Sequence, residues 1–66
     1  MHKKQEQIER HIEVYSKAID LDPKYARTYY NRGYAYSKLG LAEKSKADRT
    51  KTDELIMKFG IDSFEK

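Results

Sequence analysis

The stretch that decides the fold is Tyr15-Ser-Lys-Ala-Ile-Asp-Leu-Asp-Pro23 together with Tyr29-Tyr-Asn-Arg-Gly-Tyr-Ala-Tyr36. Its first part has apolar residues at helical spacing and ends in a proline, which disfavours helix at the residue before it and cannot donate to the preceding turn. Its second part places small and aromatic residues three and four positions apart, as on one face of a helix. The stretch therefore predicts two helices joined by a turn at Pro23.

Outward from this turn, the spacing of apolar residues predicts three helices. We expect them at about residues 4–21, 24–39 and 42–58, followed by a tail at 59–66. Gly40 closes the second helix, because glycine adopts the left-handed cap conformation at little cost. The third helix is charged through its centre, and Ile61-Asp-Ser-Phe64 is the part of the tail that could fold back onto the core. The sequence thus predicts a single all-α domain of three antiparallel helices.

The composition argues against several classes of protein. The chain has no cysteine and two histidines, so no disulfide, thiolate metal site or zinc site can be assembled. No glycine-rich phosphate loop and no pairing of a nucleophile with a base is found, and we expect neither catalysis nor a cofactor. No apolar stretch approaches the roughly 20 residues that span a bilayer, and no signal sequence is evident. We therefore expect a soluble, cytoplasmic protein.

The positive charge is concentrated in the middle of the chain. Of the net charge of +3, residues 23–40 contribute +4 and the two flanking segments together contribute −1. The basic residues of this middle segment, which contains no acidic residue, are Lys24, Arg27, Arg32 and Lys38. A local excess of one sign attracts partners of the opposite sign. The charge pattern therefore favours an acidic partner for the second helix.

Residues 6–56 resemble the tetratricopeptide (TPR) repeat, which has a period of about 34 residues. Each TPR repeat is an antiparallel pair of helices, A and B. Residues 6–22 look like helix B of one repeat, residues 26–40 like helix A of the next and residues 41–56 like its helix B. The residues that carry the resemblance are Ile8, Tyr15, Ala18, Pro23, Tyr29, Gly33 and Tyr36. The resemblance implies about one and a half repeats, with Gly33 and Ala47 allowing close approach of the helices.

Several positions depart from the TPR pattern. Arg32 stands where leucine is commonest. Ser45, Arg49 and Thr52 occupy places that usually hold alanine, a large aromatic residue and alanine. The departures in the third helix resemble a terminal capping repeat, whose outer face is exposed to solvent and therefore polar. A generic three-helix bundle with tyrosines in its core is the alternative fold.

The resemblance also implies a function and a site. TPR repeats bind other proteins, and their A helices line the groove that receives a peptide. Carried onto this chain, the groove residues are Arg27, Tyr30, Tyr34, Ser37 and Lys38, with Asn31 beside them. Tyrosine supplies rigid contact area and arginine pairs with carboxylates, so this face suits an acidic peptide. The alternative is that one or both tyrosines pack against the first helix or a second copy.

Two other functions compete with peptide binding. A chain of 66 residues buries only about 60% of its unfolded surface, so a homo-oligomer would supply the missing core. Copies could stack, or the second and third helices could fuse through Gly40 and exchange between partners. Nucleic-acid binding, suggested by the pI near 9.2, ranks third. The surface is small, and the acidic residues of the other helices weaken the positive electrostatic potential that phosphates would require.

Overall fold

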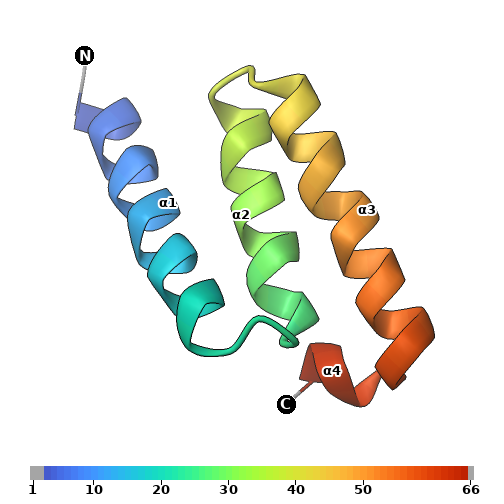
Figure 1. Ribbon diagram of the computed structural model, residues 1–66. Coiled ribbons are helices and arrows are strands. Elements are labelled where there is room, and N and C mark those ends of the chain that lie inside the picture. Colours follow the sequence, from blue (N-terminus) through green and yellow to red (C-terminus); the bar gives the residue numbers. More distant parts are fainter. Residues whose placement is uncertain (1–2, 66) are drawn as a thin grey trace.

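The computed structural model describes residues 3–65, and in these residues every regular element is a helix (Figure 1). The four helices are α1 (Lys3–Leu21), α2 (Ala26–Lys38), α3 (Ala42–Phe59) and α4 (Asp62–Glu65). The first three are antiparallel to their neighbours in sequence, and α2 lies between α1 and α3 (Figure 1). This confirms the predicted all-α architecture of a TPR-like helical hairpin fragment.

Local sequence signals set the helix ends. The turn after α1 contains a hydrogen bond from the Tyr25 amide to the Asp22 carbonyl, at 3.2 Å. At the end of α2, Gly40 has a φ of +77°, which favours glycine. There the amide of Leu41 donates to the carbonyl of Tyr36 and the amide of Gly40 to that of Ser37, both at 3.0 Å, which is the Schellman pattern. Pro23 and Gly40 thus place α2 between two sharp reversals.

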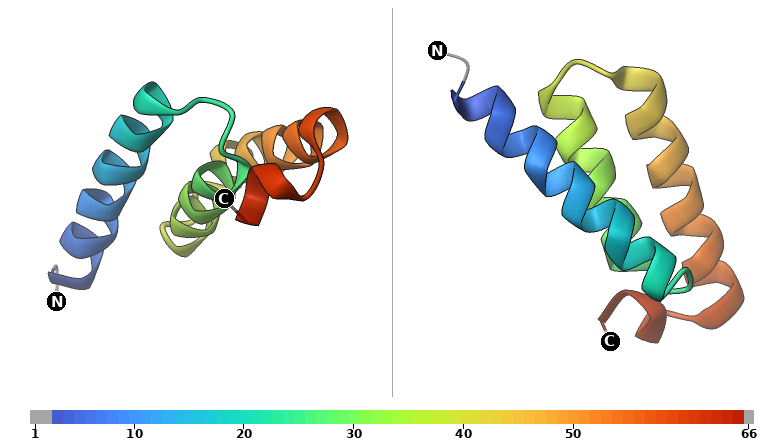
Figure 2. Two further views of the ribbon diagram at one scale, coloured as in Figure 1. Left: turned by 90° about the horizontal axis from the view of Figure 1, so that it is seen from below. Right: turned by 60° about the vertical axis from the view of Figure 1, so that its left-hand side comes forward.

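The apolar core is small and lies near the end of the hairpin where α2 begins and α3 ends. Its buried members are Ala26, Tyr29 and Leu55. Ile19, Ile56 and Phe64 pack against them from α1, α3 and α4. Figure 2 shows α4 turning back beneath this end of the hairpin. The segment of the tail that could fold back therefore does so, through Phe64.

The crossing of α2 and α3 depends on one of the two small residues that the sequence singled out. A Cβ atom added to Gly33 would lie 3.1 Å from the Asp48 Cβ atom and 3.2 Å from the Ser45 carbonyl oxygen. The role expected for Gly33 is confirmed. The role expected for Ala47 is wrong, because Ala47 is exposed. The buried residues of α3 are instead Ser45, Asp48, Thr52 and Leu55, so three of the four are polar.

We predict that Gly33→Ala destabilises the protein although alanine has the higher helix propensity. The propensity gain of about 1 kcal/mol is opposed by overpacking, which typically costs about 1–3 kcal/mol. Thermal unfolding followed by circular dichroism should show a lower Tm. An alanine substitution at the exposed Gln7 of α1 serves as the control and should leave the Tm nearly unchanged. An unchanged or higher Tm for Gly33→Ala would show that α2 and α3 are not closely packed at this residue.

Candidate functional site

The six residues predicted to bind a peptide all lie on α2, and five of them are exposed. Arg27, Tyr30, Tyr34, Ser37 and Lys38 are exposed, whereas Asn31 is half-buried. The exposed residues follow one another at intervals of three or four, apart from the adjacent pair Ser37 and Lys38, and so share one side of the helix. The exposed fraction is 46% for Tyr30 and 59% for Tyr34, which is high for aromatic side chains. We name these six residues the α2 face.

The beginning of the α2 face is partly covered by the C-terminal helix. The ring of Phe64 meets that of Tyr30 edge to face, with 5.5 Å between centroids. The Arg27 guanidinium lies 5.6 Å from the centroid of the same Phe64 ring, within the range of a cation–π contact. Tyr30 therefore packs against α4, whereas the two neighbours that the sequence analysis considered for it were α1 and a second copy. The accessible part of the α2 face lies toward its C-terminal end.

Tyr34 stands between two hollows at that end. One hollow, of about 180 Å³, opens toward α3 and is lined by Tyr30, Tyr34, Ser37, Ser45 and Arg49. The other, of about 160 Å³, opens toward α1 and is lined by Ile8, His11, Tyr15, Asn31, Tyr34, Ala35 and Lys38. The Lys38 ammonium lies 4.8 Å from the centre of the Tyr34 ring. The Ser37 hydroxyl donates to the Tyr34 carbonyl oxygen at 2.8 Å.

The structure thus divides the predicted site rather than gathering it in one cavity. Asn31 and Lys38 lie on the α1 side of Tyr34, whereas Ser37 and Tyr30 lie on the α3 side. Arg27 lines neither hollow and lies beside Phe64. Ser45 and Arg49 of α3 complete one hollow, and sequence reasoning noted them only as departures from the TPR pattern. The family pattern places helix A residues in the groove, and it therefore carried no signal for side chains supplied by α3.

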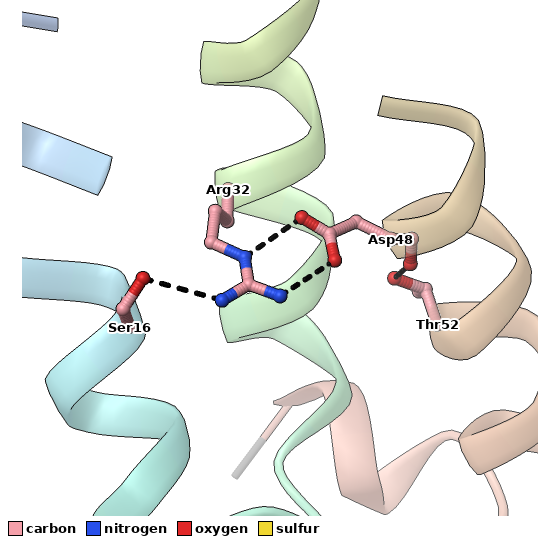
Figure 3. Close-up of polar contacts among 4 residues, drawn as sticks. All are labelled: Ser16, Arg32, Asp48 and Thr52. Atoms are coloured by element: carbon pink, nitrogen blue, oxygen red, sulfur yellow. Dashed lines mark hydrogen bonds and ion pairs between the residues drawn. The ribbon is translucent and has the colours of Figure 1, made fainter. Parts of the chain in front are cut away.

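A partly buried ion pair joins α2 to α3 behind this face (Figure 3). The Arg32 guanidinium donates to both carboxylate oxygens of Asp48, from Nε and from a terminal nitrogen, each at 2.8 Å. Its other terminal nitrogen donates to the Ser16 hydroxyl of α1 at 3.2 Å. The Thr52 hydroxyl donates to the Asp48 backbone carbonyl at 2.8 Å. Arg32 therefore contacts both helices that flank α2.

The ion pair changes the electrostatics of the interior. Its hydrogen bond to Asp48 raises the pKa of the Arg32 guanidinium, so the charge is retained at every ordinary pH. Burial raises the pKa of the neighbouring Tyr29 hydroxyl, and the nearby Arg32 charge partly opposes this increase. The sequence analysis counted Arg32 among the positive charges of residues 23–40. The Asp48 carboxylate neutralises this charge, so one fewer positive charge is available to a ligand. Lys24, Arg27 and Lys38 carry the remaining excess, and in residues 3–65 no carboxylate lies within ion-pair distance of Arg27 or Lys38.

The sequence held one signal for the ion pair. Arg32 and Asp48 each lie eight residues from Gly40, on opposite sides of it. In an antiparallel helical hairpin, residues equidistant from the turn lie side by side. A basic and an acidic residue at such positions, one of them at a place typical of leucine, predict a buried pair.

We predict that removing one member of the pair destabilises the protein more than removing both. Arg32→Met leaves the Asp48 carboxylate unpaired at 7% exposure, and an uncompensated buried charge costs about 3–5 kcal/mol. Asp48→Leu should cost less, because the Arg32 side chain is 21% exposed and can turn toward water. The double variant should recover most of the loss, since apolar replacement of a buried pair is often neutral.

Urea unfolding of the unaltered protein, the two single variants and the double variant measures their free energies of unfolding. Lys51→Met, at an exposed position of α3, is the control for a new methionine. Additive losses in the double variant would show that the two side chains do not interact.

The Arg32–Asp48 pair thus lies behind an exposed face that carries aromatic and basic side chains. Within residues 3–65, no three or more histidine, cysteine or acidic side chains gather as metal ligands would. None of the helices in the same range combines the length and hydropathy that a bilayer-spanning segment needs. The available chemistry on the α2 face is hydrogen bonding, cation–π contact and charge attraction by lysine and arginine.

Comparison with known proteins identifies the family. The model of the TPR repeat family matches residues 1–40, which include the whole of α1 and of α2. Curated proteins and solved structures gave no match to the chain. Members of the TPR family are generally non-catalytic and serve as protein–protein interaction modules. Because the match extends over more than half of the sequence, this chain belongs to the TPR repeat family.

Proposed function

We propose that this chain is a protein-interaction module that binds an acidic peptide on the α2 face, centred on Tyr34. The observation that carries the proposal is the position of Tyr34. Its ring is 59% exposed, lies between two hollows and has the Lys38 ammonium 4.8 Å from its centre. An exposed aromatic ring beside an unpaired cation provides both contact area and charge for a ligand.

The charges around Tyr34 support an acidic ligand. Arg49 lines the hollow on one side of the ring and Lys38 the hollow on the other. In residues 3–65 neither makes an ion pair with a carboxylate. A peptide with acidic side chains lying across Tyr34 would bring a negative charge to both. Long-range attraction would also accelerate its association and make the rate depend on salt.

We predict that Tyr34→Ala weakens binding of acidic peptides by about tenfold or more, since central aromatic residues dominate interface energies. The probes are fluorescently labelled peptides that differ only in the replacement of glutamate by glutamine. Anisotropy titrations should show affinity rising with the number of glutamates and falling with salt. Phe59→Ala removes a ring of similar exposure, 47%, away from the α2 face and should bind as the unaltered protein does.

Two results would contradict the proposal. One is equal affinity for the glutamate and glutamine peptides. The other is undiminished binding by Tyr34→Ala while circular dichroism shows the helices intact.

Self-association is a second candidate function, and the exposed side of α1 favours it. Val14 and Leu21 lie two helical turns apart on α1 and are 62% and 87% exposed. No large side chain of the described residues is fully buried, so the isolated chain has little core. Stacking of two copies through α1 would cover both side chains. Exchange of helices is less favoured, because Gly40 at φ +77° would have to become helical before α2 and α3 could fuse.

We predict that sedimentation over a concentration series detects a dimer if α1 is an interface. The Tm should then rise with protein concentration, as mass action requires. Leu21→Lys should shift the protein to monomer and abolish this dependence, whereas Leu41→Lys, at an exposed leucine before α3, should not. A protein that remains monomeric and unfolds cooperatively at every concentration would rule out this candidate.

A further inference from the structure

The hollow between α2 and α3 has features of a binding pocket for a single side chain. Its volume of about 180 Å³ is below the roughly 300–1,000 Å³ of pockets for drug-sized ligands. It adjoins a cavity of about 440 Å³, and the two share Ser37, Ser45 and Arg49 in their linings. The larger cavity lies mainly along α3, and its lining also includes Lys46 and Asp53. A peptide on the α2 face could place one side chain in the smaller pocket.

The side chain of Arg49, which lines this pocket, passes close to Gly33 of α2. A Cβ atom at Gly33 would lie 3.6 Å from the Arg49 Cγ atom, so the aliphatic part of Arg49 lies across α2 where α2 has no side chain. Arg32 is already satisfied by Asp48 and Ser16. Arg49, in contrast, forms no ion pair or hydrogen bond that involves its side chain in residues 3–65. Its Cγ atom lies against α2 at Gly33, and its guanidinium has no ion-pair partner among these residues.

The other groups of the pocket are hydroxyls. Ser45 is only 7% exposed, lines both cavities and has no hydrogen-bond partner for its hydroxyl in the described part of the chain. Tyr30 and Tyr34 contribute phenol side chains, and the hydroxyl hydrogen of Ser37 is used for the Tyr34 carbonyl. Hydroxyls donate to an anion as readily as to water. The lining of the smaller pocket thus combines one positive charge, several donors and no carboxylate.

We infer that this pocket binds one side-chain carboxylate of the acidic peptide, and that Arg49 is the residue that recognises it. The inference rests on the proposed function, because it assumes that the ligand lies along the α2 face. Arginine pairs with a carboxylate through two parallel hydrogen bonds. A phosphate carries about −1.5 to −2 charges at neutral pH, more than the one cation in the lining can balance. A glutamate or aspartate side chain matches that cation in charge.

The test uses small probes rather than a peptide. Amide shifts of ¹⁵N-labelled protein are followed during titration with N-acetylglutamate α-amide, whose one carboxylate is on the side chain. The neutral N-acetylglutamine α-amide is the matched probe. We expect saturable shifts at Tyr34, Ser45 and Arg49 with the acidic probe only. Arg49→Gln should weaken binding by about tenfold or more, as expected for loss of a hydrogen bond to a charged group.

Further variants separate recognition from folding. Arg49→Lys keeps a charge and an aliphatic chain over Gly33 but loses the paired donors, so it should fold and bind with an intermediate affinity. Arg10→Gln removes an exposed arginine from α1 and should bind the probe unchanged. The inference is overturned by an equal response to the neutral probe, by undiminished binding in Arg49→Gln, or by tighter binding of N-acetylphosphoserine α-amide.

The two proposals fail in different ways. Weaker binding of the glutamate peptides by Tyr34→Ala, with the small acidic probe still bound at Arg49, would support both proposals. Peptide binding that survives Arg49→Gln with full preference for glutamate would overturn the carboxylate pocket and leave the α2 face in place. Binding of the small probe with no binding of any peptide would overturn the α2 face as a peptide site and leave the pocket.

Discussion

The hydrogen-bonded pair of Arg32 and Asp48 fixes where α2 lies, and the other contacts of the molecule depend on that position. The apolar core is confined to one end of the hairpin, around Tyr29 and Leu55. Farther along, the buried side chains of α3 are polar, so apolar burial contributes little to holding the helices together there. There the contacts of Arg32 take the place of apolar packing, since it donates hydrogen bonds to Asp48 of α3 and to Ser16 of α1.

The same arrangement determines which charges are available to a ligand. Arg32 points toward the interior and is neutralised, whereas Lys38 and Arg49 have no carboxylate partner in residues 3–65. Gly33, which follows Arg32 in the sequence, allows Asp48 and the aliphatic part of Arg49 to approach α2 closely. Arg32 therefore joins the two helices of the hairpin, whereas Arg49 is exposed beside them. The α2 face obtains its basic character from Arg27 and Lys38, and Arg49 of α3 adds a third positive charge beside it.

The C-terminal helix limits this face at its other end. Phe64 packs against the small core and against the ring of Tyr30, so α4 contributes both to stability and to the shape of the site. A ligand that approaches α2 meets Phe64 beside Arg27 and an open surface beside Tyr34. The accessible surface is thus displaced toward the turn at Gly40.

Local signals made the fold predictable, and what was missed are contacts between residues that lie far apart in the chain. Pro23 and Gly40 act on their own neighbours in sequence, so the two reversals and the all-α class followed from the sequence, and the TPR resemblance was confirmed by the family match. The pairing of Arg32 with Asp48 and the packing of Phe64 on Tyr30 join residues far apart in the chain. Ala47 was misplaced because a charged helix has no apolar stripe to show which side faces inward, and here that side is polar.

Residue-by-residue amide hydrogen exchange of the unliganded protein tests the central claim most directly, namely that the Arg32–Asp48 pair makes α2 and α3 one cooperative unit. Exchange reports the free energy of local opening for each helix. If the claim is correct, the interior amides of α2 and α3 exchange slowest and share one opening free energy, while those of the first half of α1 exchange faster. Different opening free energies for α2 and α3, or an α1 as protected as both, would contradict it.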